Sequence, residues 1–274
     1  MGGLYVLAKR VSATPLAPLR SYAYVWDGVL LFAPRAIVNR RHAHFAATVL
    51  IAVDKPFALT LDDGVRRYCD VALLAPNTHR QTDSEGQPLV DFLIDPDDAA
   101  YRFLHPLLQQ QPVLLLPRES IGASRRRFAR LFAGQLRPDE ARKLVDEALQ
   151  ALCPRPPDAL PWDPRILKAA HYMRSRIPEA VPAIAEIAHQ AHLSESRFCH
   201  LFRSQMGLPL RQFLLWLRIR HAMKLWAQGK SLGDIAHGAG FYDHAHFTRT
   251  LRRMTDYTPS MLTNPALVER YDCD

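Results

Sequence analysis

The 274-residue sequence lacks any apolar run long enough to cross a bilayer, which takes about 18–20 consecutive residues. Its longest apolar runs are short, as at residues 46–53 and 113–116. The first six residues lack the basic and then apolar order of a secretion signal, and Val6 lacks the hydroxyl group of a myristoylation site. We therefore expect a cytoplasmic protein with no membrane partner.

Cysteine is scarce: four residues are scattered along the chain without a C-x-x-C pair. This pattern excludes a disulfide scaffold and the usual zinc clusters, and it fits a reducing compartment. The sequence also shows no Ser-His-Asp, paired-carboxylate or phosphate-loop pattern. We therefore predict no catalytic residues, no metal, no cofactor and no enzymatic activity.

The charge balance is basic, with 35 Lys and Arg against 27 Asp and Glu and a net charge of +8. Residues 1–160 carry +3 of this charge, whereas the shorter segment 161–274 carries +5. A basic surface favours an anionic partner such as a nucleic acid. The excess is modest, so the motifs below must decide the function.

The N-terminal part predicts short strands at 45–53, 70–75 and 88–94, with Asp-Asp-Gly at 62–64 as a hairpin turn. Short strands with such turns favour a small barrel or sandwich. Helical periodicity begins near residue 98, and an apolar stripe follows a helix over 139–152. This stripe is either buried inside the domain or forms the seam of a dimer.

The proline-rich stretch 153–161 cannot continue a helix and predicts a stiff linker. It divides the chain into an N-terminal domain, residues 1–152, and a helical domain, residues 162–274. The expected fold class is α+β: a β-barrel with trailing helices, followed by an all-α domain.

The helical domain contains a weak internal repeat with an offset near 49 residues. Each copy predicts a helix, a tight turn and a second helix, over about 181–207 and 231–255. Ser194 and Asp243 are suited to cap the second helices, and Gly207 to end the first of them. Two helices joined in this way form a helix-turn-helix unit, whose second helix enters the major groove of DNA.

The helical wheel separates a core face from an outward face in each second helix. Phe198 and Phe202 face inward in the first copy, and Phe247 and Leu251 in the second. The outward positions correspond between the copies at the offset of 49, and they are Ser196, Cys199, His200 and Arg203, then Ala245, Thr248, Arg249 and Arg252. The helix predicted between the copies, 210–228, would be about 28 Å long and could hold two reading helices about one DNA turn apart.

The second copy resembles the AraC/XylS family of transcription regulators. The resemblance rests on Ser-Leu-x-Asp-Ile-Ala at 231–236, Ala-Gly-Phe-Tyr-Asp at 239–243, His-Phe-Thr-Arg at 246–249 and Tyr-Thr-Pro at 257–259. The first copy resembles the first helix-turn-helix of that family through Ile187-Ala, Leu193-Ser, Phe198 and Phe202. Asp256 stands where the family commonly has Gly, and Leu251 where it usually has Phe.

The resemblance covers about residues 165–264 and implies sequence-specific binding to double-stranded DNA. Ser196, Cys199 and His200 take base-reading positions of the first unit, and His244, Ala245, Thr248 and Arg249 those of the second. With Arg197, Arg203 and Arg252 they make up the predicted DNA contacts. The family also implies a homodimer, and RNA polymerase as a further partner of an activator.

The histidines of the N-terminal part are similar to those of cupin-type sensor domains. His42-Ala-His44 precedes a strand and Pro76-Asn-Thr-His79 follows one. The carboxylate expected shortly after the first pair is missing, so we favour a metal-free pocket for a small-molecule effector, with His42, His44 and His79 as binding residues. The alternative is that these are ordinary polar histidines at the rim of a barrel.

Three functions remain open to test. The first is a transcription regulator with a ligand-sensing barrel and paired reading helices. The second is a metal-dependent cupin enzyme that uses the three histidines and has an accessory helical domain. The third is a DNA-binding protein whose N-terminal module binds only another protein.

Overall fold

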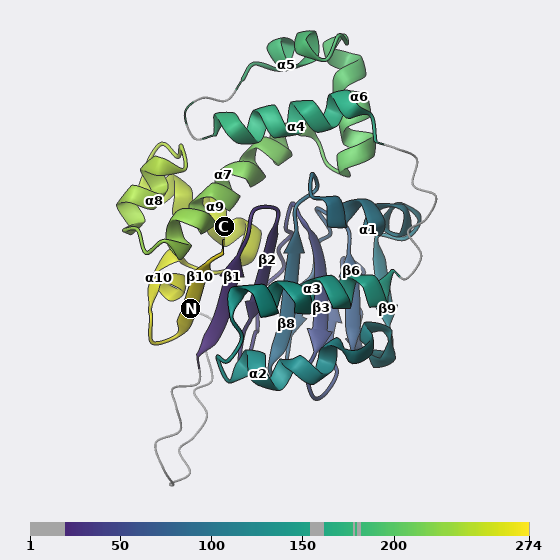
Figure 1. Cartoon of the computed structure of the whole chain (residues 1–274), viewed down its shortest axis with the longest axis vertical. Coiled ribbons are helices and arrows are strands. Elements are labelled where there is room, and N and C mark those ends of the chain that lie inside the picture. Colours follow the sequence, from purple (N-terminus) through teal and green to yellow (C-terminus); the bar gives the residue numbers. More distant parts are fainter. Residues whose placement is uncertain (1–19, 154–161, 178, 180–181, 274) are drawn as a thin grey trace, which may run out of the picture.

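The computed structural model describes residues 20–153, 162–177, 179 and 182–273, and Figure 1 shows two parts. A strand-rich part occupies one end of the molecule, and helices gather at the other end and along one side. The predicted α+β class with a helical C-terminal part is confirmed. Most of the predicted linker, residues 154–161, lies outside the described residues.

Ten strands within the described residues form two open sheets rather than the closed barrel that we expected. The larger has the order β10-β1-β2-β8-β3-β6-β9 and the smaller β5-β4-β7. Their bounds are β1 Ser21–Val25, β2 Val29–Ala33, β3 Ala47–Ala52, β4 Phe57–Thr60, β5 Arg66–Cys69, β6 Val71–Leu74, β7 Gln81–Asp83, β8 Leu89–Ile94, β9 Val113–Leu116 and β10 Val268–Asp272. The predicted hairpin joins β4 to β5, where Gly64 adopts a φ of +73°.

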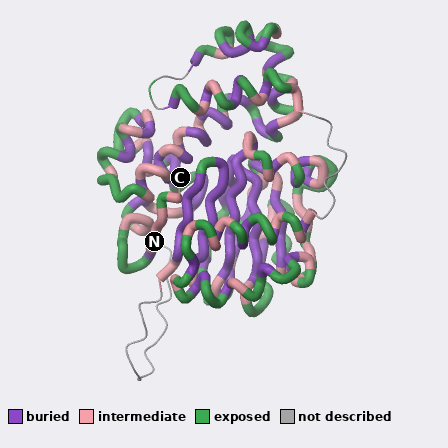
Figure 2. The backbone as a smooth tube through the Cα atoms, viewed as in Figure 1, coloured by how far each residue is buried: buried purple, intermediate pink, exposed green. Residues whose placement is uncertain are grey.

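The larger sheet is buried on both faces, because alternate side chains of each strand enter different cores. Figure 2 shows its central strands as buried along their length. From β8, Phe92 packs with Leu144 of a helix that covers one face, whereas Leu93 packs with Trp226 of the C-terminal helices on the other. The covering helices are α1 Ala99–Gln110, η1 Arg118–Arg127, α2 Phe128–Phe132 and α3 Pro138–Leu152.

The apolar stripe of α3 resolves one alternative left by the sequence. Ala141, Leu144, Val145 and Ala148 are fully buried against the sheet. The stripe therefore belongs to the core of the N-terminal domain.

The C-terminal helices are α4 Pro164–Arg176, α5 Ile184–Gln190, α6 Glu195–Met206, α7 Leu210–Ala227, α8 Leu232–Gly238, α9 His244–Thr255 and α10 Pro259–Thr263. Helix α7 is buried around much of its circumference, with Leu214, Trp216 and Ala222 buried on different sides. Other helices and the sheet pack against these sides, whereas Arg211 is exposed. In Figure 1 it runs between the α5–α6 pair and the α8–α9 pair.

The chain ends in a strand that the sequence analysis did not predict. β10 pairs in parallel with β1, from Ser21 opposite Val268 to Val25 opposite Asp272, and becomes an edge of the N-terminal sheet. The segment expected to be all-α thus closes onto the other domain (Figure 1). No helix in the described ranges is long and apolar enough to span a membrane.

Candidate nucleic-acid interface and interdomain cavity

The first helix-turn-helix unit consists of α5 and α6. The hydroxyl of Ser194 accepts a hydrogen bond from the amide of Arg197 at 3.3 Å, as expected of an N-cap. Gly207 ends α6 with a φ of +74°, the left-handed conformation that glycine adopts without strain. Phe198 and Phe202 are fully buried, which turns the opposite side of α6 outward.

The second unit, α8 and α9, is built in the same way. Ser231 caps α8 by accepting from the amide of Asp234 at 3.2 Å, and Asp243 caps α9 by accepting from the amide of His246. Helix α9 ends at Asp256, a non-glycine residue with a φ of +58°. Phe247 and Leu251 are buried.

The predicted DNA contacts lie on the outward sides of α6 and α9. Cys199 and Thr248 are half-buried. The others are exposed, and they are Ser196, Arg197, His200, Arg203, His244, Ala245, Arg249 and Arg252. Within the described residues, none of the four arginines forms an ion pair, so their guanidinium groups remain available to an anion.

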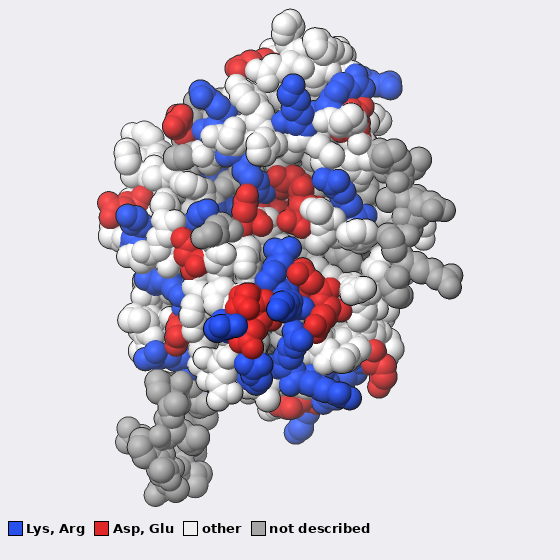
Figure 3. Space-filling view, viewed as in Figure 1, with Lys and Arg blue, Asp and Glu red and all other residues white. Residues whose placement is uncertain are grey.

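Three further observations bear on these helices. The hydroxyl of Thr248 is buried and has no hydrogen-bond partner within the described residues. Helix α7, with 18 residues, is about 27 Å long, and the two units lie at its two ends (Figure 1). Figure 3 shows basic side chains over the part formed by α4 to α6, and acidic side chains gathered between the domains.

The structure brings two of the three predicted ligand-binding histidines together. The rings of His42 and His44 lie 5.0 Å apart, and both residues are buried. His79 is partly exposed in the loop before β7, where its Nδ1 is 3.7 Å from a carboxylate oxygen of Asp62. In the part of the chain that the structure describes, no three His, Cys, Asp or Glu side chains converge on a metal position.

Burial and a neighbouring guanidinium together set the charge state of the two histidines. Arg80, 2% exposed, donates from Nη2 to Nδ1 of His44 at 2.6 Å and to the hydroxyl of Thr48 at 3.2 Å. Burial, and then the charge of Arg80, lowers the pKa of His42 to about 4 and that of His44 well below its ordinary value. Both rings are therefore neutral at pH 7.

Asp91 lies in the same region with a raised pKa. Burial raises the pKa of this carboxyl to about 7, although Arg80 acts in the opposite direction. Its Oδ1 has no hydrogen-bond partner within the described residues. His44 and Asp91 both border a cavity, whereas His42 and His79 do not.

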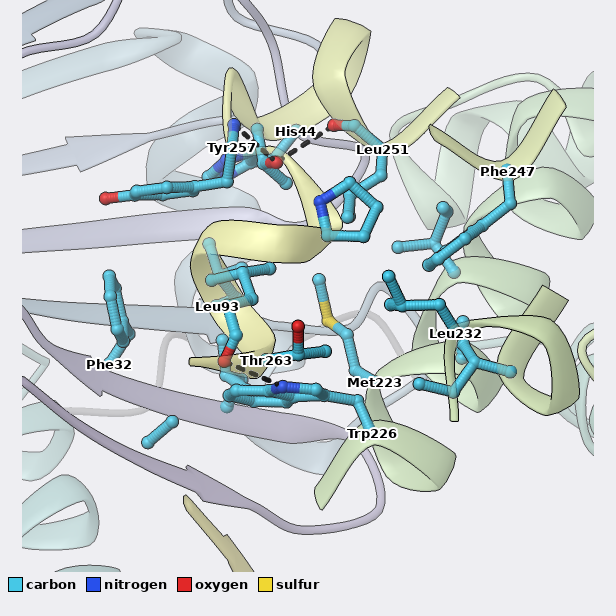
Figure 4. A pocket seen from close by; sticks show the side chains of 18 of the residues that line it. Phe32, His44, Leu93, Met223, Trp226, Leu232, Phe247, Leu251, Tyr257 and Thr263 are labelled. Atoms are coloured by element: carbon cyan, nitrogen blue, oxygen red, sulfur yellow. Dashed lines mark hydrogen bonds between the residues drawn. The ribbon is translucent and has the colours of Figure 1, made fainter. Parts of the chain in front are cut away.

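The cavity has a volume of about 60 Å³ and lies between the sheet and the second helix-turn-helix unit. Phe32 and Leu93 form its wall on the sheet side, and Leu232, Phe247 and Leu251 face them from α8 and α9 (Figure 4). Met223 and Trp226 of α7 close it, and Trp226 donates from Nε1 to the carbonyl of Leu262 at 3.0 Å. Both domains therefore contact anything that enters it.

Sequence reasoning assigned the ligand to the N-terminal domain and missed the half of this wall that comes from α7 to α9. One signal was present. Leu251 stands where the resemblance leads one to expect Phe, and this smaller side chain borders the cavity.

Comparison with known proteins gives a match to a family described as a helix-turn-helix domain, over residues 187–264. The arabinose operon regulatory protein of Escherichia coli is 30% identical over 101 residues, which are 36% of this chain and 35% of that protein. The probable transcriptional regulator LumQ of Photobacterium leiognathi is 31% identical over 91 residues, 33% of this chain and 36% of that protein. The chain thus matches about a third of the length of these relatives.

Among solved structures, a ligand-free variant of ToxT from Vibrio cholerae has the same two-domain fold. Its TM-score is 0.60 at 12% identity, and the match covers 86% of this chain and 97% of that one. ToxT bound to an unsaturated fatty acid matches with a TM-score of 0.50 at 12% identity, over 85% of this chain and 92% of that one.

Proposed function

We propose that this chain, a member of the AraC/XylS family by its C-terminal domain, is a sequence-specific transcription regulator that reads two adjacent major-groove segments with α6 and α9. Exposed Lys and Arg would neutralise phosphates and release counterions, which gives affinity without sequence preference. The outward side chains of α6 and α9 would then discriminate between bases.

The observation that carries this proposal is the equivalence of the two outward faces. Arg203 ends the face on α6 and Arg252 the face on α9, each exposed and outside the ion pairs formed within the described residues. Buried apolar side chains fix both helices on a single brace, α7. Two recognition helices held at a fixed spacing in this way can enter two major-groove segments of one duplex.

The experiment is selection of oligonucleotides from a random pool with the full chain, followed by affinity measurements on the selected site. Log affinity is expected to fall with log salt at a slope of about −4 to −8. Arg249→Ala is expected to cost about 1–3 kcal/mol and to relax base preference. Arg126→Ala, which removes an exposed arginine from the N-terminal domain, serves as the control and should leave base preference unchanged. An unchanged affinity of Arg249→Ala for the selected site would refute the assignment.

The proposal includes an apolar small-molecule effector bound in the interdomain cavity. His44 and Asp91 would meet its polar end, and the apolar side chains of both domains its body. A ToxT structure with the same fold holds an unsaturated fatty acid, so oleic acid is the first probe. Its chain is much larger than the cavity of about 60 Å³, so the two walls must move apart to admit it. Because the cavity wall includes α8 and α9, an occupant that prefers one domain arrangement would change DNA affinity.

The cupin enzyme is the alternative from another class. It would need His42, His44 and His79 to converge on one metal ion, whereas His79 is partly exposed and lies beside Asp62. This geometry favours the regulator. Elemental analysis of the purified protein decides between them, because stoichiometric iron, nickel or zinc that is lost in His44→Ala would support the enzyme.

A protein-binding role for the N-terminal domain is the third possibility. Thermal stabilisation by one compound of a metabolite panel would count against it, since a ligand of the folded state raises apparent stability.

The homodimer that the family implies would use a surface other than the apolar stripe of α3, which is buried. Sedimentation equilibrium measures its mass. RNA polymerase is the further partner proposed for an activator.

A further inference from the structure

A second cleft, of about 550 Å³, separates the N-terminal domain from the first helix-turn-helix unit. The loop at residues 75–78 and helix α1 form one wall, with Thr78 and His105 among its side chains. The end of α6 and the start of α7 form the other, with Arg203 and Gln212. It shares no lining residue with the cavity described above.

Two buried polar atoms at this cleft lack hydrogen-bond partners within the described residues. One is Nε2 of His105, a residue only 7% exposed, and the other is Oε1 of Gln212 on the opposite wall. Buried polar atoms are nearly always paired, because an unpaired one costs about 1–3 kcal/mol. A molecule between the two walls would supply the missing partners.

The charge around the cleft is positive. Arg203 contributes a guanidinium, and none of the described residues that line the cleft is acidic. Helix α7 begins after Pro209 at the edge of the cleft, so the positive end of its helix dipole lies there, although the amide of Gln212 is paired with the carbonyl of Pro209 at 2.9 Å. Burial lowers the pKa of His105 and outweighs its hydrogen bond with the backbone of Ser204, so the ring is neutral at pH 7. Because the carbonyl of Ser204 accepts the one N–H of the neutral ring, the unpaired Nε2 is an acceptor.

We propose that this cleft binds a small carboxylic acid that also carries a hydroxyl or amino group. The carboxylate would bind Arg203, close to the positive end of the α7 dipole. The second group would donate hydrogen bonds to Oε1 of Gln212 and Nε2 of His105, both of which are acceptors. A ligand of this kind would give a hydrogen-bond partner to each of the two unpaired atoms, Nε2 of His105 and Oε1 of Gln212.

An occupied cleft would also weaken binding to DNA, a consequence that rests on the proposed function. Arg203 is one of the predicted DNA contacts, so a carboxylate and a phosphate would compete for it. In addition, Nε2 of Gln109 on α1 donates to the carbonyl of Ser204 on α6 at 3.0 Å, which joins α1 to the reading helix.

The test is calorimetric titration of the full chain, without DNA, with malate, citrate, serine and glutamate, and with inorganic phosphate as a charged probe that lacks the carboxylate. At least one of the four is expected to bind with a 1:1 ratio, and phosphate much more weakly. Gln212→Leu and His105→Phe are each expected to weaken binding about tenfold, the effect of losing one hydrogen bond to the ligand. His189→Phe, on the exposed face of α5, is the control and should bind as the original chain does.

Failure of all four acids to bind would overturn the proposal and would leave a bridging water as the partner of the two atoms. If both cleft variants bound the acid as tightly as the original chain does, the proposal would also be overturned, because the ligand would then lie elsewhere. Because the titration contains no DNA, its failure is distinct from a failure of the DNA-binding proposal.

Discussion

Asp95, at the end of β8, holds the guanidinium of Arg220 on α7 at 3.0 Å, and both side chains are almost completely buried. Trp216 on the same helix donates from Nε1 to this carboxylate at 2.9 Å, and Arg174 on α4 donates to it at 2.9 Å. One carboxylate of the N-terminal domain thus joins two helices of the C-terminal domain.

We predict that Asp95→Asn destabilises the chain by about 3–5 kcal/mol, because it leaves the guanidinium of Arg220 buried beside a neutral group. Urea unfolding measures this loss. Asp27→Asn, which changes a 68%-exposed carboxylate beside Arg174, should cost about 0–1 kcal/mol. Equal losses in the two variants would mean that burial of the Asp95 pair does not matter.

Asp256 makes a second interdomain contact and also holds a strained backbone conformation. Its carboxylate accepts hydrogen bonds from the backbone amide and the guanidinium of Arg40, both at 2.8 Å. We predict that Asp256→Gly is more stable than Asp256→Ala by about 1–2 kcal/mol, because both lose this contact but only Ala keeps the strained positive φ. Thermal unfolding of the two variants makes the comparison, and a more stable Ala variant would contradict it.

The raised pKa of Asp91 predicts a pH dependence. Between the ordinary carboxyl pKa of 3.8 and the folded value of about 7, the folded chain keeps a proton that the unfolded chain releases. The contribution of Asp91 to stability is therefore lost as pH rises through this window, by about 1.4 kcal/mol per pH unit.

Asp91→Asn should remove this slope. The stability of the original chain relative to the variant is expected to decline steadily from pH 4.5 to 6.5, as measured by urea unfolding at each pH. Using the difference cancels the opposite slope of His42 and His44, whose lowered pKa values favour the folded chain as pH rises. A difference that does not change with pH would show that Asp91 is ionised in the folded chain.

Leu251→Phe tests the effector site in the interdomain cavity. The larger ring would occupy part of the space of about 60 Å³, so binding of oleic acid should be lost while affinity for the selected DNA site is kept. Overpacking would cost about 1–3 kcal/mol of stability. Calorimetry with oleic acid makes the measurement. Undiminished binding by the variant would place the fatty acid outside this cavity.

Local chemistry made much of the fold predictable. Ser194 and Asp243 cap their helices as expected, because a capping side chain contacts only amides a few residues away. The turn at Gly64 was predictable for the same reason. The second strand of that hairpin was not, since β5 carries exposed Arg and Tyr and shows little apolar alternation.

The parts that could not be predicted depend on contacts between distant segments. β10 pairs with β1 across almost the whole chain length, and its polar residues give no clear strand period. The sequence likewise could not show that His79 lies away from His42 and His44, because the path of the loop after residue 75 determines where its side chain lies. The sequence shows Asp256 only as a departure from the Gly that is common in the family, because its contact with Arg40 exists only in the folded chain.

The central claim is that α6 and α9 read two separate blocks of one duplex, and base substitution along the selected DNA site tests it most directly. The original chain is predicted to discriminate bases in two blocks whose centres lie about 10–10.5 base pairs apart. His200→Ala should lose preference in one block and Arg249→Ala in the other. A single block, or loss of preference in the same block by both variants, would contradict the account.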